Sequence, residues 1–200
     1  MLAAMKEIIN PYVVIESDIA KKELLLKEDG ADSKIKKLYI TNIPENALAF
    51  TLDHQPGGPT NRWFKQLSPY VDVGNDKGVN KGCDLIIIWQ EGEQPYALVF
   101  DLKSDKPKPE ATQKQLNNSE LFLNYLLTMV NLHYGVATNT LQIKKAIGTT
   151  DSRAVRKSAT YRPNALATLV ADYHIEVITP KAYQTGYISL PQLARRAPHG

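Results

Sequence analysis

The chain has 200 residues, 43% of them hydrophobic, and its 24 Lys and Arg against 21 Asp and Glu give a net charge of +3. This length and composition fit one domain, spanning residues 1–200, with a sizeable hydrophobic core. The single cysteine excludes an internal disulfide and favours a reducing compartment. The first residues lack the pattern of a signal peptide and no apolar run approaches eighteen residues, so we expect a cytoplasmic protein that does not enter a membrane.

The N-terminal part of the chain predicts a helix and then extended segments. Asn10 followed by Pro11 is typical of a helix start, and the pattern predicts a helix over about residues 11–27 that ends before Gly30. Four apolar residues recur at helical spacing and would form its buried face: Tyr12, Ile15, Ile19 and Leu26. Two extended stretches follow at residues 37–40 and 47–52.

A β-hairpin is predicted in the middle of the chain. Residues 82–89 and 96–103 are runs of strand-forming residues, and the segment 90–95 between them is rich in turn formers. Side chains alternate between the two faces of a strand, so Val99, Asp101 and Lys103 share one face of the second strand. Cys83, at the start of the first strand, is expected to be a small buried residue and not a nucleophile.

This hairpin brings together residues that suit metal-dependent chemistry. Asp101 and Lys103 project from the same face, and Asp84 begins the neighbouring strand. Two carboxylates provide the oxygen ligands that Mg²⁺ prefers, and a lysine beside them can activate water or hold a phosphate. Two other interpretations stay open, because Asp101 and Lys103 could form an exposed ion pair and Asp84 could be a turn residue.

The second half of the chain predicts alternating helices and strands. A helix is expected from residue 107 to about 133, then a strand at 144–150, a helix at 164–173 and a strand at 174–179. Together with the hairpin, this order predicts an α/β fold with a central mixed β-sheet and flanking helices. Four polar residues line one stripe of the long helix: Gln113, Asn117, Glu120 and Asn124.

Positive charge is concentrated in the second half of the chain. Residues 1–100 carry a net charge of −3 and residues 101–200 carry +6. The densest segment, residues 153–162, contains Arg153, Arg156, Lys157 and Arg162 together with hydroxyl groups and a tyrosine. Such a segment is suited to gripping a phosphate backbone, and an ordinary exposed connection is the alternative.

At these positions the chain resembles the PD-(D/E)XK nuclease superfamily. Asp84 matches the first acidic position and Asp101-Leu102-Lys103 matches the (D/E)-X-K element, while the usual proline is replaced by Cys83. The resemblance covers about residues 80–180 and implies a restriction-endonuclease-like fold. It also implies a role for Gln115 in the following helix, and for an acidic residue of the first core helix, either Glu16 or Glu23, with Glu16 preferred as a metal ligand.

The resemblance and the residues together predict a Mg²⁺-dependent nuclease, with Mn²⁺ able to substitute, that cuts DNA as an endonuclease. A non-catalytic member of the same fold that binds nucleic acid or protein, and an RNA-cleaving enzyme, are the alternatives. The expected partner is nucleic acid, and a homodimer or a partner subunit stays open. The four histidines lack the spacing of a zinc site, and no Gly-rich phosphate loop is present.

Overall fold

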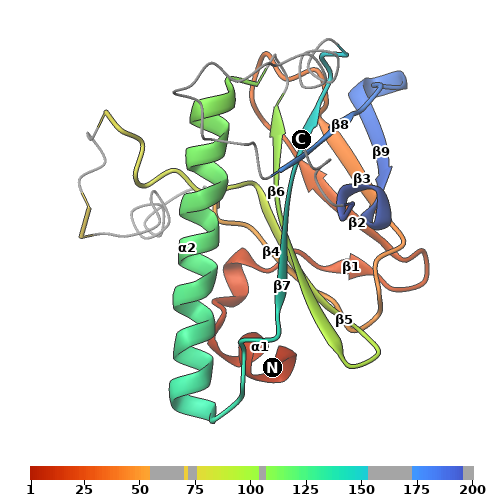
Figure 1. Cartoon of the computed structure of the whole chain (residues 1–200). Coiled ribbons are helices and arrows are strands. Elements are labelled where there is room, and N and C mark those ends of the chain that lie inside the picture. The colour runs from red at the N-terminus through yellow and green to blue at the C-terminus, as the bar shows by residue number, and fades with distance from the viewer. Residues whose placement is uncertain (55–69, 72–75, 104–106, 153–172, 196–200) are drawn as a thin grey trace.

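The computed structural model describes residues 1–54, 70–71, 76–103, 107–152 and 173–195 (Figure 1). Within these ranges it is a mixed α/β protein with two mixed β-sheets and three α-helices. The helices are α1 (Leu2–Ile8), α2 (Pro109–Tyr134) and α4 (Leu190–Leu193), and two short 3₁₀ turns are η1 (Pro11–Val13) and η3 (Ala182–Gln184). None of the helices in the described part of the chain is long and apolar enough to cross a membrane.

The larger sheet has five strands in the order β4 (Leu48–Phe50), β5 (Leu85–Glu91), β6 (Gln94–Lys103), β7 (Gln142–Thr149) and β8 (His174–Val177). β4, β5 and β6 are antiparallel neighbours, whereas β7 and β8 run parallel to β6. The predicted hairpin is confirmed, and Gly92 in its turn adopts the left-handed backbone conformation (φ 58°) that glycine tolerates. The predicted strand at 144–150 is β7.

The smaller sheet has four strands in the order β1 (Ser17–Asp18), β2 (Glu23–Lys27), β3 (Lys37–Thr41) and β9 (Thr185–Ser189). The predicted helix over residues 11–27 is therefore wrong. Only η1 is helical there, and its start is as expected, because the Asn10 side chain accepts a hydrogen bond from the Tyr12 N–H at 3.0 Å. The chain then leaves the helical path and forms β1 and β2.

Burial against the sheet explains why helix-favouring residues form a strand here. Leu24 and Leu26 are buried and Leu25 faces the opposite side, which is the alternation of a strand. By contrast, Tyr12 and Ile19 of the expected buried helix face are 68% and 63% exposed. The helix propensity of these residues is only a weak preference, and packing between the two sheets overrides it.

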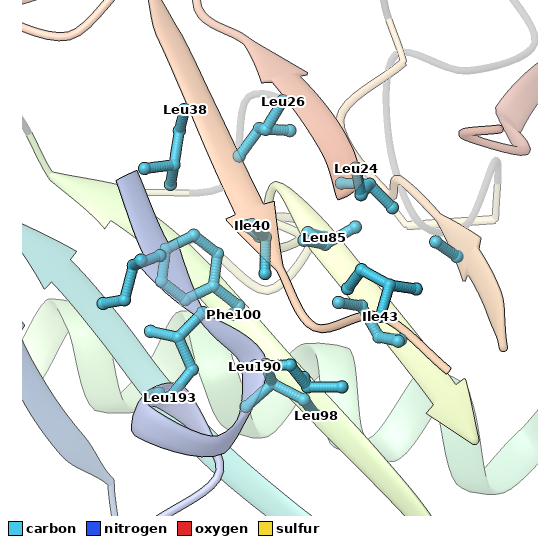
Figure 2. Close-up of a cluster of buried hydrophobic side chains, with 14 of the residues drawn as sticks. Leu24, Leu26, Leu38, Ile40, Ile43, Leu85, Leu98, Phe100, Leu190 and Leu193 are labelled. Atoms are coloured by element: carbon cyan, nitrogen blue, oxygen red, sulfur yellow. The ribbon is translucent and has the colours of Figure 1, made fainter. Parts of the chain in front are cut away.

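Two hydrophobic clusters divide the molecule into three layers. One cluster lies between the two sheets, where side chains of β2 and β3 meet those of β5 and β6 and are closed off by α4 (Figure 2). The other lies between the five-stranded sheet and the helices α1 and α2 (Figure 1). The expected helix at 107–133 is confirmed as α2, and its buried residues include Leu116, Leu123, Leu127 and Val130. The helix expected at 164–173 falls almost wholly outside the described residues.

Candidate active site at the end of strands β5 and β6

Asp101 and Lys103 lie on the face of β6 that is turned toward α2. Val99, two residues before Asp101, belongs to the hydrophobic cluster under that helix. Asp101 is fully buried, and its Oδ2 is 2.5 Å from Nζ of Lys103, whose side chain is 30% exposed. The predicted alternation of side chains is confirmed, and an exposed ion pair is excluded because the carboxylate has no contact with solvent.

Asp84 stands directly before β5 and reaches the same place. Because Leu85 pairs with Phe100, the residue before Leu85 lies opposite Asp101. Oδ2 of Asp84 accepts a hydrogen bond from the Leu102 N–H at 2.6 Å, and the Asp101 charge repels the Asp84 carboxylate. The structure therefore brings the two predicted carboxyl groups close together.

The two carboxyl groups are hard to ionise together. Burial, and then repulsion from Asp101, raise the pKa of Asp84 well above its ordinary value. Burial also raises the pKa of Asp101, and the Lys103 ammonium opposes this effect. The two groups titrate as a pair. One lysine leaves the pair short of positive charge, so a further cation would be stabilised here.

Gln115 of α2 connects the members of this site. Its Oε1 accepts a hydrogen bond from Nζ of Lys103 at 2.9 Å, and its Nε2 donates to Oδ1 of Asp101 at 2.9 Å and to the carbonyl of Gly82 at 2.7 Å. Gln113 points elsewhere, because its Nε2 donates to Asn117 at 2.9 Å. Gln115 therefore lies beside the predicted site, as the resemblance implies, and Gln113 does not.

The segment that leads into Asp84 is held by two further α2 side chains that sequence reasoning missed. Oγ of Ser119 accepts a hydrogen bond from the Cys83 N–H at 2.8 Å and donates to the Gln115 carbonyl at 2.9 Å. Nδ2 of Asn118 donates to the carbonyl of Gly78 at 2.9 Å. Their position one turn after Gln115 was a usable signal, since residues four apart lie on one side of a helix. Together they fix the backbone from which Asp84 projects.

Cys83 is buried, as expected. Burial raises the pKa of its thiol to about 12. The thiol is therefore protonated at neutral pH and is not a nucleophile.

Neither of the predicted N-terminal acids joins this site. The bridge between Val14 and Phe50 places exposed Glu16 level with Ile88, four residues along β5 from Asp84, which is about 13 Å at the rise of a strand. Glu23 belongs to β2 of the other sheet. The assignment of Glu16 as a metal ligand is wrong because the helix that would have carried it does not form.

Asp53 is a neighbouring acid that the sequence reasoning missed. It follows β4, and the Leu52 N–H donates to the Cys83 carbonyl at 3.3 Å, so Asp53 lies next to the start of β5. Its charge contributes to the raised pKa values of Asp84 and Asp101. An acid at the end of the extended stretch 47–52 was the available signal. In the described part of the chain, no three His, Cys, Asp or Glu side chains gather closely enough to hold a metal ion.

A second polar cluster lies further along the same interface. Nζ of Lys145, a buried residue of β7, contacts Oδ1 of Asn117 at 2.9 Å and Oε2 of Glu120 at 2.8 Å. Sequence reasoning identified the polar stripe of α2 but missed its partner on the sheet. This cluster ties α2 to β7, two residues from Ile147, which pairs with Asp101.

The predicted phosphate-binding residues Arg153, Arg156, Lys157 and Arg162 lie outside the described residues. The chain up to them is described, and it ends close to the site. Thr149 of β7 is buried and pairs with Lys103 in the parallel register. Residue 152, the last one described before the basic segment, is three positions beyond Thr149.

Comparison with protein-family models, with curated proteins and with solved structures finds no match.

Proposed function

We propose that this chain is a Mg²⁺-dependent nuclease that hydrolyses phosphodiester bonds, with DNA as its substrate and a restriction-endonuclease-like core. The observation that carries the proposal is that Asp84, Asp101 and Lys103 lie close together at one end of the β5–β6 hairpin. The order β5, β6, α2, β7, with β7 parallel to β6, is the order expected for that core and supports it.

The donor set fits a hard divalent cation. Asp84 and Asp101 present carboxylate oxygens side by side, and oxygen is the ligand that Mg²⁺ and Mn²⁺ prefer. Burial raises the pKa of both acids, and repulsion from Asp101 raises that of Asp84 further, so a cation that neutralised them would be stabilised at this point. A bound divalent ion would supply Lewis acidity toward a phosphoryl oxygen and would lower the pKa of a coordinated water.

Lys103 and Gln115 complete the chemistry that the chain itself provides. The Lys103 side chain is partly exposed, so its ammonium can reach a water or a phosphate oxygen while it stays beside Asp101. Gln115 holds Lys103 through its carbonyl oxygen and Asp101 through its amide nitrogen, so it positions both groups at once. The amide carries no charge and therefore does not add to the repulsion between the acids.

The test is a cleavage panel with purified protein. Supercoiled plasmid, linear duplex, single-stranded DNA and RNA are each incubated with Mg²⁺, with Mn²⁺ or with EDTA. We expect nicking or linearisation of plasmid with either metal and none with EDTA. Asp76→Asn, which changes an exposed acid paired with Lys77, is the matched control that should cleave like wild type.

The other outcomes of the panel choose between the alternatives. Cleavage of RNA alone would change the proposed substrate from DNA to RNA and would leave the proposed metal-dependent hydrolysis unchanged. Binding without cleavage under every metal condition would make the chain a non-catalytic binding protein and would overturn the proposal.

A further inference from the structure

The C-terminal half of α2 carries an exposed apolar stripe. Leu121, Tyr125 and Leu132 are 67%, 57% and 70% exposed, and Thr128 lies between them. Spaced by four, three and four residues, these side chains fall within about 60° of arc on the helix. This spacing is the one by which a helix packs against another helix.

The C-terminal half of α2 also lacks charged side chains, although the solvent-facing side of a helix usually carries them. On the same face, the first turns of α2 carry Glu110 and Lys114, which form an ion pair at 2.8 Å. From residue 121 to residue 143 there is no Asp, Glu, Lys or Arg. The face thus changes from charged to apolar at Leu121, which marks the edge of a surface suited to an apolar contact.

A groove runs beside the stripe and belongs to the same side of the molecule. It has a volume of about 510 Å³. Its lining residues are Ile8, Tyr125, Leu126, Met129, His133 and Tyr134. Along the C-terminal half of α2, Figure 1 shows the five-stranded sheet on one side and no labelled helix or strand on the outer side. The stripe and the groove are therefore adjacent, and Tyr125 belongs to both.

We propose that this face pairs with the same face of a second copy of the chain and forms a two-fold symmetric dimer. In such an interface the stripe of each copy enters the groove of the other copy. This requires stripe and groove to lie on one surface, as they do here. A patch without formal charge also meets its own copy without like-charge repulsion. The inference is independent of the proposed nuclease activity.

The exposed area of the stripe fits a small interface with a second copy of the chain. At about 200 Å² for a free Leu or Tyr side chain, the three large stripe residues offer on the order of 400 Å². A stable interface takes about 800 Å² from each partner, so the stripe supplies about half of that area, which is the size of a weak dimer whose formation depends on protein concentration.

The first test measures mass in solution by light scattering and by sedimentation equilibrium between about 1 and 100 μM protein. We expect twice the mass of the 22.3 kDa chain. Tyr125→Glu places like charges across the two-fold axis and should raise the dissociation constant at least tenfold. The control is Tyr183→Glu, because Tyr183 is 95% exposed and lies in η3, next to β9 of the four-stranded sheet and away from α2. Circular dichroism checks that both variants fold.

The second test uses the absence of other accessible thiols in the described chain, since Cys83 is the single cysteine and is buried. Thr128→Cys, within the stripe, should form a disulfide-linked dimer under mild oxidation, and Tyr183→Cys, away from α2, should not. A wild-type monomer at every concentration, with no Thr128→Cys cross-link, would overturn the proposal whatever else this face binds. A dimer that Tyr125→Glu leaves intact would overturn it as well.

Discussion

Replacing Asp84 by Asn should stabilise the metal-free protein while it removes the proposed activity. The pKa of Asp84 is raised well above its ordinary value by burial and by Asp101, so the folded state pays for ionising this group at neutral pH. Asparagine has no charge to bury, and its side-chain oxygen can still accept the hydrogen bond from the Leu102 N–H.

The direction of the pKa shift gives the sign of the effect. Each unit by which a folded pKa exceeds the unfolded one costs about 1.4 kcal/mol of stability once both states are ionised. The raised pKa of Asp84 therefore predicts a higher melting temperature for Asp84→Asn at neutral pH, on a scale of about 2–4 °C for each kcal/mol gained in a chain of this size.

The pH dependence has a definite sign. A folded pKa above the unfolded one means that the folded state binds more protons, so stability falls as the pH rises from the unfolded pKa through the folded pKa. The gain from Asp84→Asn should vanish below the unfolded pKa of 3.8, where both states are protonated, and should grow as the pH rises toward the folded pKa.

The assay is thermal unfolding by circular dichroism from about pH 3 to pH 8 in EDTA and again with Ca²⁺ or Mg²⁺. Wild type should gain stability on adding metal, and Asp84→Asn should gain far less. A variant that is less stable than wild type at neutral pH, or a difference that does not change with pH, would refute the reasoning about charge repulsion.

Three further predictions concern the surroundings of the acids. Lys103→Ala should lower turnover by at least about 100-fold while Ca²⁺ or Mg²⁺ binding, measured by calorimetry, changes far less. Ser119→Ala should leave the buried Cys83 N–H without its acceptor and cost about 1–3 kcal/mol of stability in thermal unfolding, with a lower cleavage rate because the segment before Asp84 loosens. Replacing Arg153 and Arg156 together by Ala should weaken binding to all DNA sequences alike and flatten the salt dependence of log affinity by roughly one to two units.

A control or a refuting outcome can be named for each of these three predictions. Equal loss of turnover and metal binding in Lys103→Ala would indicate a structural role for the lysine. Thr128→Ala removes an exposed hydroxyl that also bonds to a carbonyl of α2, and it should change stability much less than Ser119→Ala. An unchanged salt slope and affinity would show that the basic segment does not contact phosphates.

The centre of the fold could be predicted because its signals are local. The β5–β6 hairpin has two strong strand patterns around a turn, and the alternation along residues 96–103 placed Asp101 and Lys103 correctly. The spacing along α2 likewise separated Gln115 from Gln113, since two positions on a helix differ by about 200°. Periodicity within one element determines which face a side chain occupies.

The remainder depends on pairings between distant segments. The sequence Glu23–Lys27 becomes a strand only because β3 lies beside it, and β3 in turn pairs with β9, more than 140 residues later. The same limitation explains the wrong assignment of Glu16 and the missed neighbour Asp53, whose position depends on how the end of β4 meets β5. No local pattern encodes such contacts.

The most direct test of the central claim compares the cleavage rates of wild type and Asp101→Asn on the best substrate of the panel, with Mg²⁺ and with EDTA. Asparagine has nearly the shape of aspartate and keeps an oxygen that can accept from Gln115, so folding should persist while the metal ligand and the partner of Lys103 lose their charge. We predict Mg²⁺-dependent cleavage by wild type and a loss of at least about 1,000-fold in a folded Asp101→Asn protein. Equal cleavage by the two proteins, or cleavage by wild type that persists in EDTA, would contradict the account.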